Sequence, residues 1–396
     1  MPVLRQRPDS ARPEERRPLL AICGTRPEAV KLAPVICALR ARGLPTLLVS
    51  TGQHPDLVPV MLREVGLTPD LDLAAGRPGA TPAQLLAAFL TYLAPVLEAY
   101  RPPMVIVQGD TVSTLAGALA AAYAGTAVAH VEAGLRTGNL GEPFPEELHR
   151  QLVARATALH LAPTEAATAA PRREGVDPTT IHVTGNSGID SLRLTLERLQ
   201  RDPGLRATIE ARFPFVLAAR RPLLLATVHR RENVGSRLGA ITAALARLAA
   251  FCEADILIPV HPNPDVQGTI VKRLSGLEGI HLLPPLDHAS IVWLMQHCRL
   301  LLTDSGGLQE EAPSLGLRTL VLRAATERPE AIQAGVSELA ELEADSIVAT
   351  VRRLLRAEPP VPVHPFGDGH AATRIAEAIA GWLRPDGAAV GLRSVG

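Results

Sequence analysis

The chain of 396 residues is long enough for two or three domains of ordinary size, each with its own hydrophobic core. Its 40 basic residues balance its 40 acidic ones, and it contains only three Tyr, two Trp and six Phe. A neutral chain so poor in aromatic side chains lacks both the basic field and the stacking residues of a nucleic-acid binder, so we expect no nucleic-acid partner.

Cysteine usage and hydropathy suggest a cytoplasmic protein. The N-terminal sequence MPVLRQRPDSARPEERRP has no apolar segment of the kind found in signal peptides, and glycines interrupt the alanine-rich run at 114–129. We therefore expect neither a signal peptide nor a membrane span. The cysteines are scattered without the spacing of metal ligands, which favours reduced thiols and predicts no metal site. They are Cys23, Cys37, Cys252 and Cys298.

The first predicted unit follows an arginine-rich leader, which we expect to be flexible over residues 1–18. The sequence PLLAICGTRPEAVKLAPVICALRARG predicts a buried strand, a glycine turn and an amphipathic helix. The turn has one glycine, Gly24, and not the three spaced glycines of a dinucleotide fingerprint, so we expect no nicotinamide or flavin cofactor. Arg26 and Lys31 place positive charge at the end of this strand, where they are either solvated or in contact with phosphate.

Further strands and helices alternate along the first half of the chain. The sequence LPTLLVS predicts a strand, residues 81–99 predict a helix, and MVIVQGD predicts another strand that ends near Asp110. This alternation is typical of a parallel sheet with right-handed connections. Asp110 either caps the following helix or faces a ligand at the strand end.

The segment AVAHVEAGLRTGNLGEPFPEELHR, residues 127–150, presents two acids on either side of one loop. AVAHV predicts a strand, and Glu132 follows it where an α/β sheet presents its ligands. Pro143 and Pro145 suit the first turn of a helix, so Glu146 stands near a helix start. Glu146 is therefore either a solvated cap or a functional acid.

A second alternation of strands and helices starts at PLLLATVHRREN and continues through ADILIPVHPNP, GIHLLPPL, RLLLTDSGG and RTLVLR. Two successive doubly wound halves predict an α/β protein with two Rossmann-like domains facing a cleft, with ligands bound at strand ends. We expect the domains to span residues 19–185 and 186–365. A helix is expected over 366–385 and a disordered tail over 386–396.

The strongest local signal of the second half is TDSGGLQEEAP, residues 303–313. Ser305, Gly306 and Gly307 end a strand and open a helix with little side-chain bulk, so their N–H groups can approach a phosphate. Glu311, one turn further on, suits the paired hydroxyls of a ribose. A Gly-Gly turn can also be only a turn, but several such groups at strand ends together favour a nucleotide-sugar site.

These motifs resemble one family over nearly the whole chain. The chain resembles the bacterial non-hydrolysing UDP-N-acetylglucosamine 2-epimerases in GTRPEAVKLAP, VQGDT, HVEAGLRTGN, PFPEE, TGN, HRREN, PVHPNP, TDSGGLQEEAPSLG and TERPEA. The resemblance implies a glycosyltransferase-B type fold in which a C-terminal helix returns to the first domain. It also implies interconversion of UDP-N-acetylglucosamine and UDP-N-acetylmannosamine without a nicotinamide cofactor, with UDP bound by the second domain, and it implies a homodimer.

The resemblance also assigns residues. It places acid/base groups at Asp110, Glu132 and Glu146, and a histidine near the diphosphate at His229. Which carboxylate takes the proton and which returns it stays open. The implied UDP-sugar contacts are Arg26, Lys31, Asp110, Glu132, His229, Leu286, Ser305, Gly306, Gly307, Glu311 and Arg328.

The chemistry of the epimerisation explains why the site needs these residue types. The proton on the second carbon of the sugar is not α to a carbonyl, so simple deprotonation faces a prohibitive barrier. If UDP leaves while the proton is taken, a glucal intermediate forms, and re-addition with protonation from the opposite face inverts the carbon. Such a site needs carboxylates on two faces and cations around the leaving diphosphate.

Other readings of the same residues are a hydrolysing 2-epimerase, an epimerase of a modified UDP-sugar, a retaining glycosyltransferase of the same fold, and a binder of nucleotide sugars without activity. Three carboxylates that serve one sugar argue against a mere binder.

Overall fold

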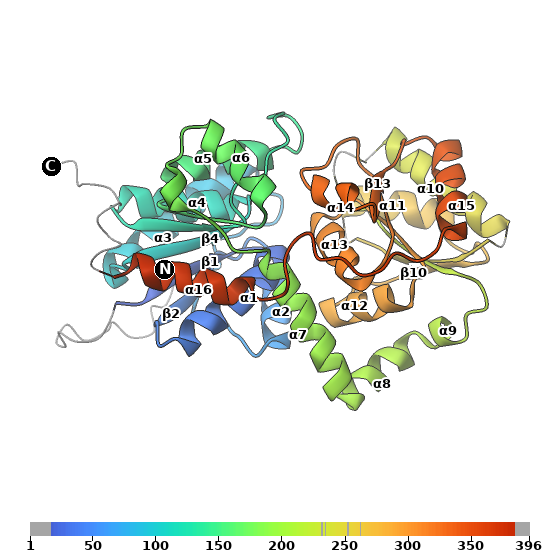
Figure 1. The fold of residues 1–396 in the computed structure, drawn as a ribbon, viewed down its shortest axis with the longest axis horizontal. Coiled ribbons are helices and arrows are strands. Elements are labelled where there is room, and N and C mark those ends of the chain that lie inside the picture. The colour runs from blue at the N-terminus through green and yellow to red at the C-terminus, as the bar shows by residue number, and fades with distance from the viewer. Residues whose placement is uncertain (1–16, 231–232, 234, 252, 262, 385–396) are drawn as a thin grey trace. The chain divides into compact units, whose positions relative to one another are not determined.

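The computed structural model describes residues 17–384 except residues 231–232, 234, 252 and 262 (Figure 1). These residues form two compact units. Of the described residues, unit 1 holds those up to Ser191 and those from Gly367 onward, and unit 2 holds those from Leu192 to Phe366. The leader expected over residues 1–18 lies outside the described residues except for its last two, and the tail expected over 386–396 lies wholly outside them.

Unit 1 is built on a parallel sheet of seven strands in the order β3-β2-β1-β4-β5-β6-β7. Its central strands are continuous apolar runs because both faces of the sheet are covered. In β1, Leu19, Ala21 and Cys23 belong to one core cluster, and Leu20 and Ile22 belong to another, as the two-residue period of a strand requires. The strands are β1 (Leu19–Cys23), β2 (Thr46–Ser50), β3 (Leu71–Asp72), β4 (Met104–Gln108), β5 (Ala127–Val131), β6 (Leu159–Ala162) and β7 (Ile181–Val183).

Helices cover both faces of this sheet. Helices α1, α2 and α16 share a core cluster with one face, while α3 and α4 share a cluster with the other. The helices are α1 (Arg26–Ala41), α2 (Leu57–Glu64), α3 (Pro82–Tyr100), α4 (Val112–Tyr123), α5 (Glu146–Ala156), α6 (Glu165–Arg173), the 3-10 helix η1 (Pro178–Thr180), α7 (Ser187–Arg201), which runs past the unit boundary, and α16 (Ala371–Trp382).

Helix α3 is the one described helix that is long and apolar enough to cross a membrane by length and composition. Its Phe89, Leu93, Val96 and Leu97 are buried in the core of unit 1. Length and composition alone are weak evidence, because an apolar helix packed against a sheet passes the same test.

The C-terminal helix α16 returns to unit 1, as expected. It packs against α1, and Ile375 and Ile379 lie in the same core cluster as the first strand. The carboxylate of Asp190 accepts bonds from the backbone N–H groups of Ala371 and Ala372, at 3.0 and 2.9 Å. A carboxylate at a helix start satisfies donors that have no partner within the helix, so Asp190 fixes where α16 begins.

Unit 2 repeats the architecture with a parallel sheet in the order β10-β9-β8-β11-β12-β13. Its strands are β8 (Leu223–Thr227), β9 (Asp255–Pro259), β10 (Ile280–Leu283), β11 (Leu300–Thr303), β12 (Thr319–Val321) and β13 (Ser337–Leu339). Its helices are α8 (Pro203–Arg212), α9 (Pro214–Leu217), α10 (Ser236–Ala250), α11 (Pro264–Leu274), α12 (His288–His297), α13 (Gly306–Glu311), η3 (Ala312–Leu315), α14 (Pro329–Gln333) and α15 (Ala344–Arg356). The prediction of two doubly wound α/β halves is confirmed.

Candidate active site

In unit 1 the candidate residues follow three neighbouring strands. Lys31 lies on α1, directly after β1, while Asp110 follows β4 and Glu132 follows β5. Strands β1, β4 and β5 are adjacent in the sheet and parallel. Their carboxyl ends therefore meet at one edge, where α/β sheets bind ligands.

Lys31 and Glu132 form a buried ion pair. The ammonium group of Lys31 bonds one carboxylate oxygen of Glu132, and the side-chain amide of Gln108 bonds the other. Both charged side chains are 8% exposed. Glu132 has a φ of 66°, a left-handed conformation that costs about 1–3 kcal/mol in a residue other than glycine. The structure thus holds this carboxylate in a strained position beside a cation, which favours its ionised form.

Asp110 is paired with Arg150 of α5. The Nε and Nη2 atoms of Arg150 lie 2.8 and 2.7 Å from Oδ2 of Asp110. His149 contributes a further contact, because its Nδ1 lies 2.8 Å from the backbone oxygen of Asp110. Arg150 was not among the predicted residues, although it closes the same segment that carries Glu132 and Glu146.

The adjacent acids Glu146 and Glu147 at the start of α5 have different surroundings. Glu147 is fully buried and accepts bonds from the backbone N–H groups of Thr137 and Gly138, at 3.0 and 3.2 Å. Glu146 is partly exposed, and no hydrogen bond or cation reaches its carboxylate within the part of the chain that the structure describes. Glu147 is therefore an internal brace of the loop, while Glu146 remains available to a ligand.

A further carboxylate, Glu28, joins two of the strand-end loops. It is buried and accepts bonds from the N–H groups of Gly24 and Thr25, at 2.9 and 2.7 Å, and from the hydroxyls of Thr111 and Thr114, at 2.6 and 2.9 Å. Burial raises the pKa of Glu28, and these bonds oppose the rise. Glu28 was not among the predicted residues, although it lies within the GTRPE motif. Its bonds fix the loop before α1 against the loop that carries Asp110.

Gly24 and Arg26 stand in the same loop. A Cβ atom at Gly24 would lie 1.9 Å from Oγ of Ser113 and 2.3 Å from Oγ1 of Thr51, so the loop requires a glycine there because of its close approach to neighbouring side chains. Arg26 is exposed at the first position of α1. Lys31 is therefore buried in its ion pair with Glu132, whereas Arg26 is an exposed residue at the start of the same helix.

In unit 2, His229 follows β8 and lies beside Asp304, which follows β11. The Nδ1 atom of His229 is 3.0 Å from Oδ1 of Asp304. Burial raises the pKa of Asp304, but the nearby His229 and the bonds that the carboxylate accepts outweigh this effect and hold the pKa below its usual range. Asp304 was not among the predicted residues, although the TDSGG motif contains it.

Ser305, Gly306 and Gly307 lie at the start of α13, beside Arg328. A Cβ atom at Gly306 would lie 2.7 Å from Cζ of Arg328, so the guanidinium rests directly on this glycine. Arg328 is 7% exposed, and its Nε lies 2.6 Å from Glu310. Glu327 holds another nitrogen of the same guanidinium. The structure thus brings the arginine and the glycine turn together.

Glu311 is held by only one of its two oxygens. Oε1 lies 3.0 Å from Nε2 of His288, whose Nδ1 lies 3.0 Å from the hydroxyl of Thr195. Oε2 is buried and has no hydrogen-bond partner among the described residues. A buried carboxylate oxygen without a partner is costly, so a hydroxyl of a bound ligand would satisfy it.

Leu286 is 5% exposed, and its side chain belongs to the hydrophobic core of unit 2. The proposal that it contacts the substrate therefore rests on the resemblance alone. Among the described residues no group of three or more His, Cys, Asp or Glu side chains is arranged to hold a metal ion.

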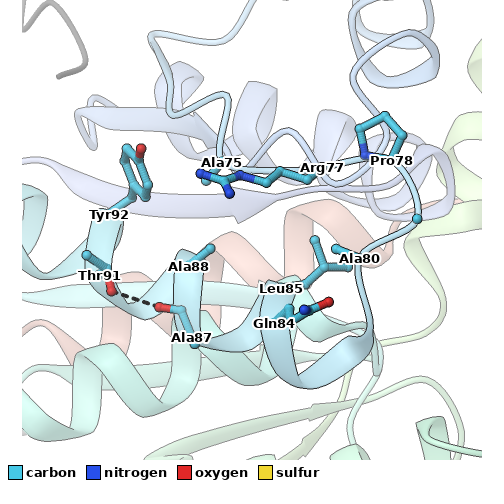
Figure 2. A pocket seen from close by; sticks show the side chains of 11 residues that line it. Ala75, Arg77, Pro78, Ala80, Gln84, Leu85, Ala87, Ala88, Thr91 and Tyr92 are labelled. Carbon is cyan, nitrogen blue, oxygen red and sulfur yellow. Dashed lines mark hydrogen bonds between the residues drawn. The ribbon is translucent and has the colours of Figure 1, made fainter.

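A hollow of about 620 Å³ lies in unit 1 between α3 and the loop that precedes it (Figure 2). Arg77, Gln84 and Tyr92 are its larger polar lining residues. Figure 2 also shows the bond of 2.8 Å from the hydroxyl of Thr91 to the backbone oxygen of Ala87 on its wall. None of the candidate site residues lines this hollow, so it is separate from the strand-end groups described above.

Comparison with known proteins points to one family. A family model for UDP-N-acetylglucosamine 2-epimerase matches residues 38–380. The UDP-N-acetylglucosamine 2-epimerases of Yersinia pestis and Escherichia coli K12 are 41% and 39% identical to this chain over 368 residues, which is 91% of this chain and 98% of each relative.

Solved structures agree. The crystal structure of UDP-GlcNAc 2-epimerase from Neisseria meningitidis bound to UDP-GlcNAc has a TM-score of 0.88 at 36% identity, covering 91% of this chain and 99% of that one. The enzyme of Methanocaldococcus jannaschii in complex with UDP-GlcNAc and UDP has a TM-score of 0.84 at 31% identity, with the same coverage of 91% and 99%. The chain therefore belongs to the UDP-N-acetylglucosamine 2-epimerase family of isomerases and has the glycosyltransferase-B type fold of that family.

Proposed function

We propose that this protein interconverts UDP-N-acetylglucosamine and UDP-N-acetylmannosamine by elimination of UDP and its re-addition to a glucal intermediate. The observation that carries the proposal is the pair of cation-bound carboxylates, Asp110 with Arg150 and Glu132 with Lys31, at adjacent strand ends of a chain from this family. In the forward direction, the bond from the first sugar carbon to UDP breaks and the proton on the second carbon passes to a carboxylate. The return step makes the same bond again and protonates the second carbon from the other face.

The three carboxylates differ in their charged neighbours. Asp110 and Glu132 each contact a buried cation, which stabilises the ionised form and suits a group that accepts a proton. No cation contacts the carboxylate of Glu146 among the described residues, and this side chain is partly exposed. We therefore assign Glu146 the role of the acid in one direction, and Asp110 or Glu132 that of the base.

The groups of unit 2 suit UDP. Arg328 supplies a fixed guanidinium beside the glycine turn, which fits a diphosphate. Glu311 offers a buried oxygen to a ribose hydroxyl. His229 adds a ring nitrogen beyond the one that faces Asp304. Together these groups would retain UDP after the bond to the sugar breaks.

Retention of UDP is the reason to propose the non-hydrolysing reaction. A hydrolysing enzyme must admit water to the first sugar carbon after UDP leaves, whereas a non-hydrolysing one must keep UDP in place until re-addition. The solved relative from Methanocaldococcus jannaschii was crystallised with both UDP-GlcNAc and UDP, which is consistent with this family holding the leaving group.

The decisive experiment is incubation of the protein with UDP-N-acetylglucosamine alone in heavy water, followed by NMR and mass spectrometry. We expect both UDP-sugars, with deuterium at the second carbon and little free UDP. Complete retention of hydrogen at that carbon would refute the elimination mechanism. Early release of UDP with free N-acetylmannosamine would move the protein to the hydrolysing reaction, and consumption only after addition of an acceptor would indicate a glycosyltransferase.

We further propose that the protein acts in the cytoplasm as a homodimer. The described cysteines, Cys23, Cys37 and Cys298, are free thiols, which suits a reducing compartment. The dimer follows from the resemblance alone, and light scattering after size-exclusion chromatography measures it directly.

A further inference from the structure

We infer that Asp304 is a positioning residue for His229, which it holds in the form protonated at Nδ1, so that Nε2 is the ring nitrogen left for a ligand. This inference deepens the proposed binding of UDP and rests on it only for the identity of that ligand. The geometry of the pair itself lies wholly within unit 2.

The contact between the two side chains shows which ring nitrogen of His229 carries the proton. Oδ1 of Asp304 lies 3.0 Å from Nδ1 of His229, and Asp304 is fully buried. The low pKa of Asp304 keeps the carboxylate ionised. An ionised carboxylate can only accept hydrogen bonds, so a contact of this length requires a proton on Nδ1.

The other bonds of Asp304 fix its orientation. Oδ2 accepts from the backbone N–H groups of His229 and Arg230 and from the side-chain amide of Asn233, each at 2.9 Å. Oδ1 also accepts from the backbone N–H of His229, at 3.1 Å. Asn233 donates in addition to the backbone oxygen of Leu322, at 3.1 Å. The carboxylate is therefore anchored by the loop after β8, and it cannot rotate away from the imidazole without breaking these bonds.

The consequence concerns what His229 can do. With Nδ1 committed to Asp304, neutral His229 presents a lone pair at Nε2, and protonated His229 presents an N–H there. Only the protonated ring can donate a bond to a diphosphate oxygen, and the ionised Asp304 stabilises that charge. The imidazole of His261, with its ring centre 5.6 Å from that of His229, is the other titratable group that faces the ring among the described contacts.

The ordinary alternative is that Asp304 only braces the loop through backbone N–H groups. An Asn at position 304 separates the two roles. The side-chain oxygen of this Asn can take the place of Oδ2 and accept from the same three donors. Its NH₂ group then faces Nδ1 of His229 and donates a hydrogen bond to it. Neutral His229 would have to move its proton to Nε2, which is the same logic by which an Asp-to-Asn change in a catalytic triad gives the wrong tautomer.

The first test identifies the tautomer of His229 directly by NMR and does not depend on enzyme activity. In ¹⁵N-labelled protein, the ring signals of His229, assigned by their loss in His229→Gln, should show a proton on Nδ1 when the ring is neutral. In Asp304→Asn the proton should lie on Nε2. A wild-type neutral ring protonated at Nε2 would overturn the inference, whatever the enzyme does to a UDP-sugar and whether or not the variant folds.

The second test is a double-mutant cycle on UDP affinity, measured by calorimetry. His229→Gln should weaken binding about tenfold to a hundredfold. Asp304→Asn should weaken it less, because the neutral ring of that variant can still donate from Nε2 but without the positive charge, and the double variant should be no weaker than His229→Gln alone. Asp304→Asn combined with Glu311→Gln is the matched control, because Glu311 contacts His288 and not this loop. In this double variant the fold-losses of UDP affinity measured for the two single variants should multiply. Multiplying losses in the first pair would show that Asp304 acts without His229.

Discussion

Arg150 binds the carboxylate of Asp110 with two nitrogens, Nε at 2.8 Å and Nη2 at 2.7 Å from Oδ2. The Nη1 atom of the same guanidinium lies 3.2 Å from Glu147. The arginine side chain is 5% exposed, so its charge acts on Asp110 with little screening by water. One buried cation thus links a proposed catalytic acid/base group to the acid that braces the loop.

Asp110→Asn should lower kcat by at least about a hundredfold, the usual scale for a lost general acid or base, and leave UDP affinity unchanged. The substitution keeps the shape of the side chain, and Arg150 retains Glu147 as a partner. Asp70→Asn is the matched control in the same unit, because Asp70 pairs with Arg40 at 2.6 Å but is 34% exposed. It should leave kcat unchanged. Steady-state kinetics of both variants provide the measurement.

Glu146→Gln and Glu147→Gln should separate activity from stability. Glu147 is fully buried and accepts bonds from two backbone N–H groups and Arg150, so its neutral replacement should lower the free energy of unfolding by about 1.5–3 kcal/mol. Glu146→Gln should leave that free energy unchanged and lower kcat at least about a hundredfold. Urea unfolding and kinetics distinguish the two. Normal turnover in Glu146→Gln would show that this acid only begins the helix.

Glu311→Gln should reduce selectivity for the ribose of UDP. The wild-type protein should bind UDP more tightly than 2′,3′-dideoxy-UDP, because the free Oε2 of Glu311 would accept from a hydroxyl. A bond to a charged group is worth about 1.5–3 kcal/mol, so the difference should be about tenfold to a hundredfold and should shrink in the variant. Calorimetry with both nucleotides measures it. Equal binding of the two by the wild-type protein would contradict a ribose contact.

The sequence was sufficient to predict most strands, because buried parallel strands are apolar runs. Five-residue segments such as β1 and β8 carry that pattern. The two-residue strand β3 and the short edge strand β13 carry too few residues to show any period. Position at a strand end also sufficed to mark Asp110, Glu132 and His229 as candidates.

The partners of these residues could not be predicted, because they depend on strand order. Asp304 meets His229 only because β11 lies next to β8 in the sheet, although β9 and β10 separate them in the chain. Lys31 and Glu132 are likewise 101 residues apart. Local patterns give no information on which strand ends become neighbours, nor on the left-handed backbone of Glu132.

Two buried histidines should make unit 1 sensitive to acid. His130 and His160 lie opposite one another on β5 and β6, and burial lowers their pKa values to about 4 and about 3. Both histidines take up a proton at about pH 6.5 in the unfolded chain but remain neutral at that pH in the folded chain. Their contribution to the free energy of unfolding should therefore fall as pH decreases from about 6.5 toward these pKa values, and it should be constant above about pH 6.5. Each histidine contributes up to about 1.4 kcal/mol per pH unit in that window.

His160→Gln should flatten this dependence on pH, whatever its effect on stability near neutral pH. The measurement is the melting temperature between about pH 7 and pH 4.5 for both proteins. His182→Gln is the control, because His182 is exposed on the neighbouring strand β7. It should leave the pH dependence as in the wild type. An equally steep loss in His160→Gln would assign the acid sensitivity to other groups.

Gly307→Ala should weaken UDP binding without harming the fold. A Cβ atom at Gly307 meets no described atom within 4 Å, whereas one at Gly306 would lie 2.7 Å from the fixed guanidinium of Arg328. Alanine is also a better helix former than glycine by about 0.5–1 kcal/mol, so the melting temperature should stay equal or rise. If a phosphate approaches the backbone of α13 as we propose, the added methyl group occupies that space and should raise the Kd for UDP about tenfold, which is ~1.4 kcal/mol. Gly268→Ala is the matched control, because Gly268 lies in α11 of the same unit with equally open space around it, and it should leave the Kd unchanged. Unchanged UDP affinity in Gly307→Ala would show that no phosphate approaches this glycine.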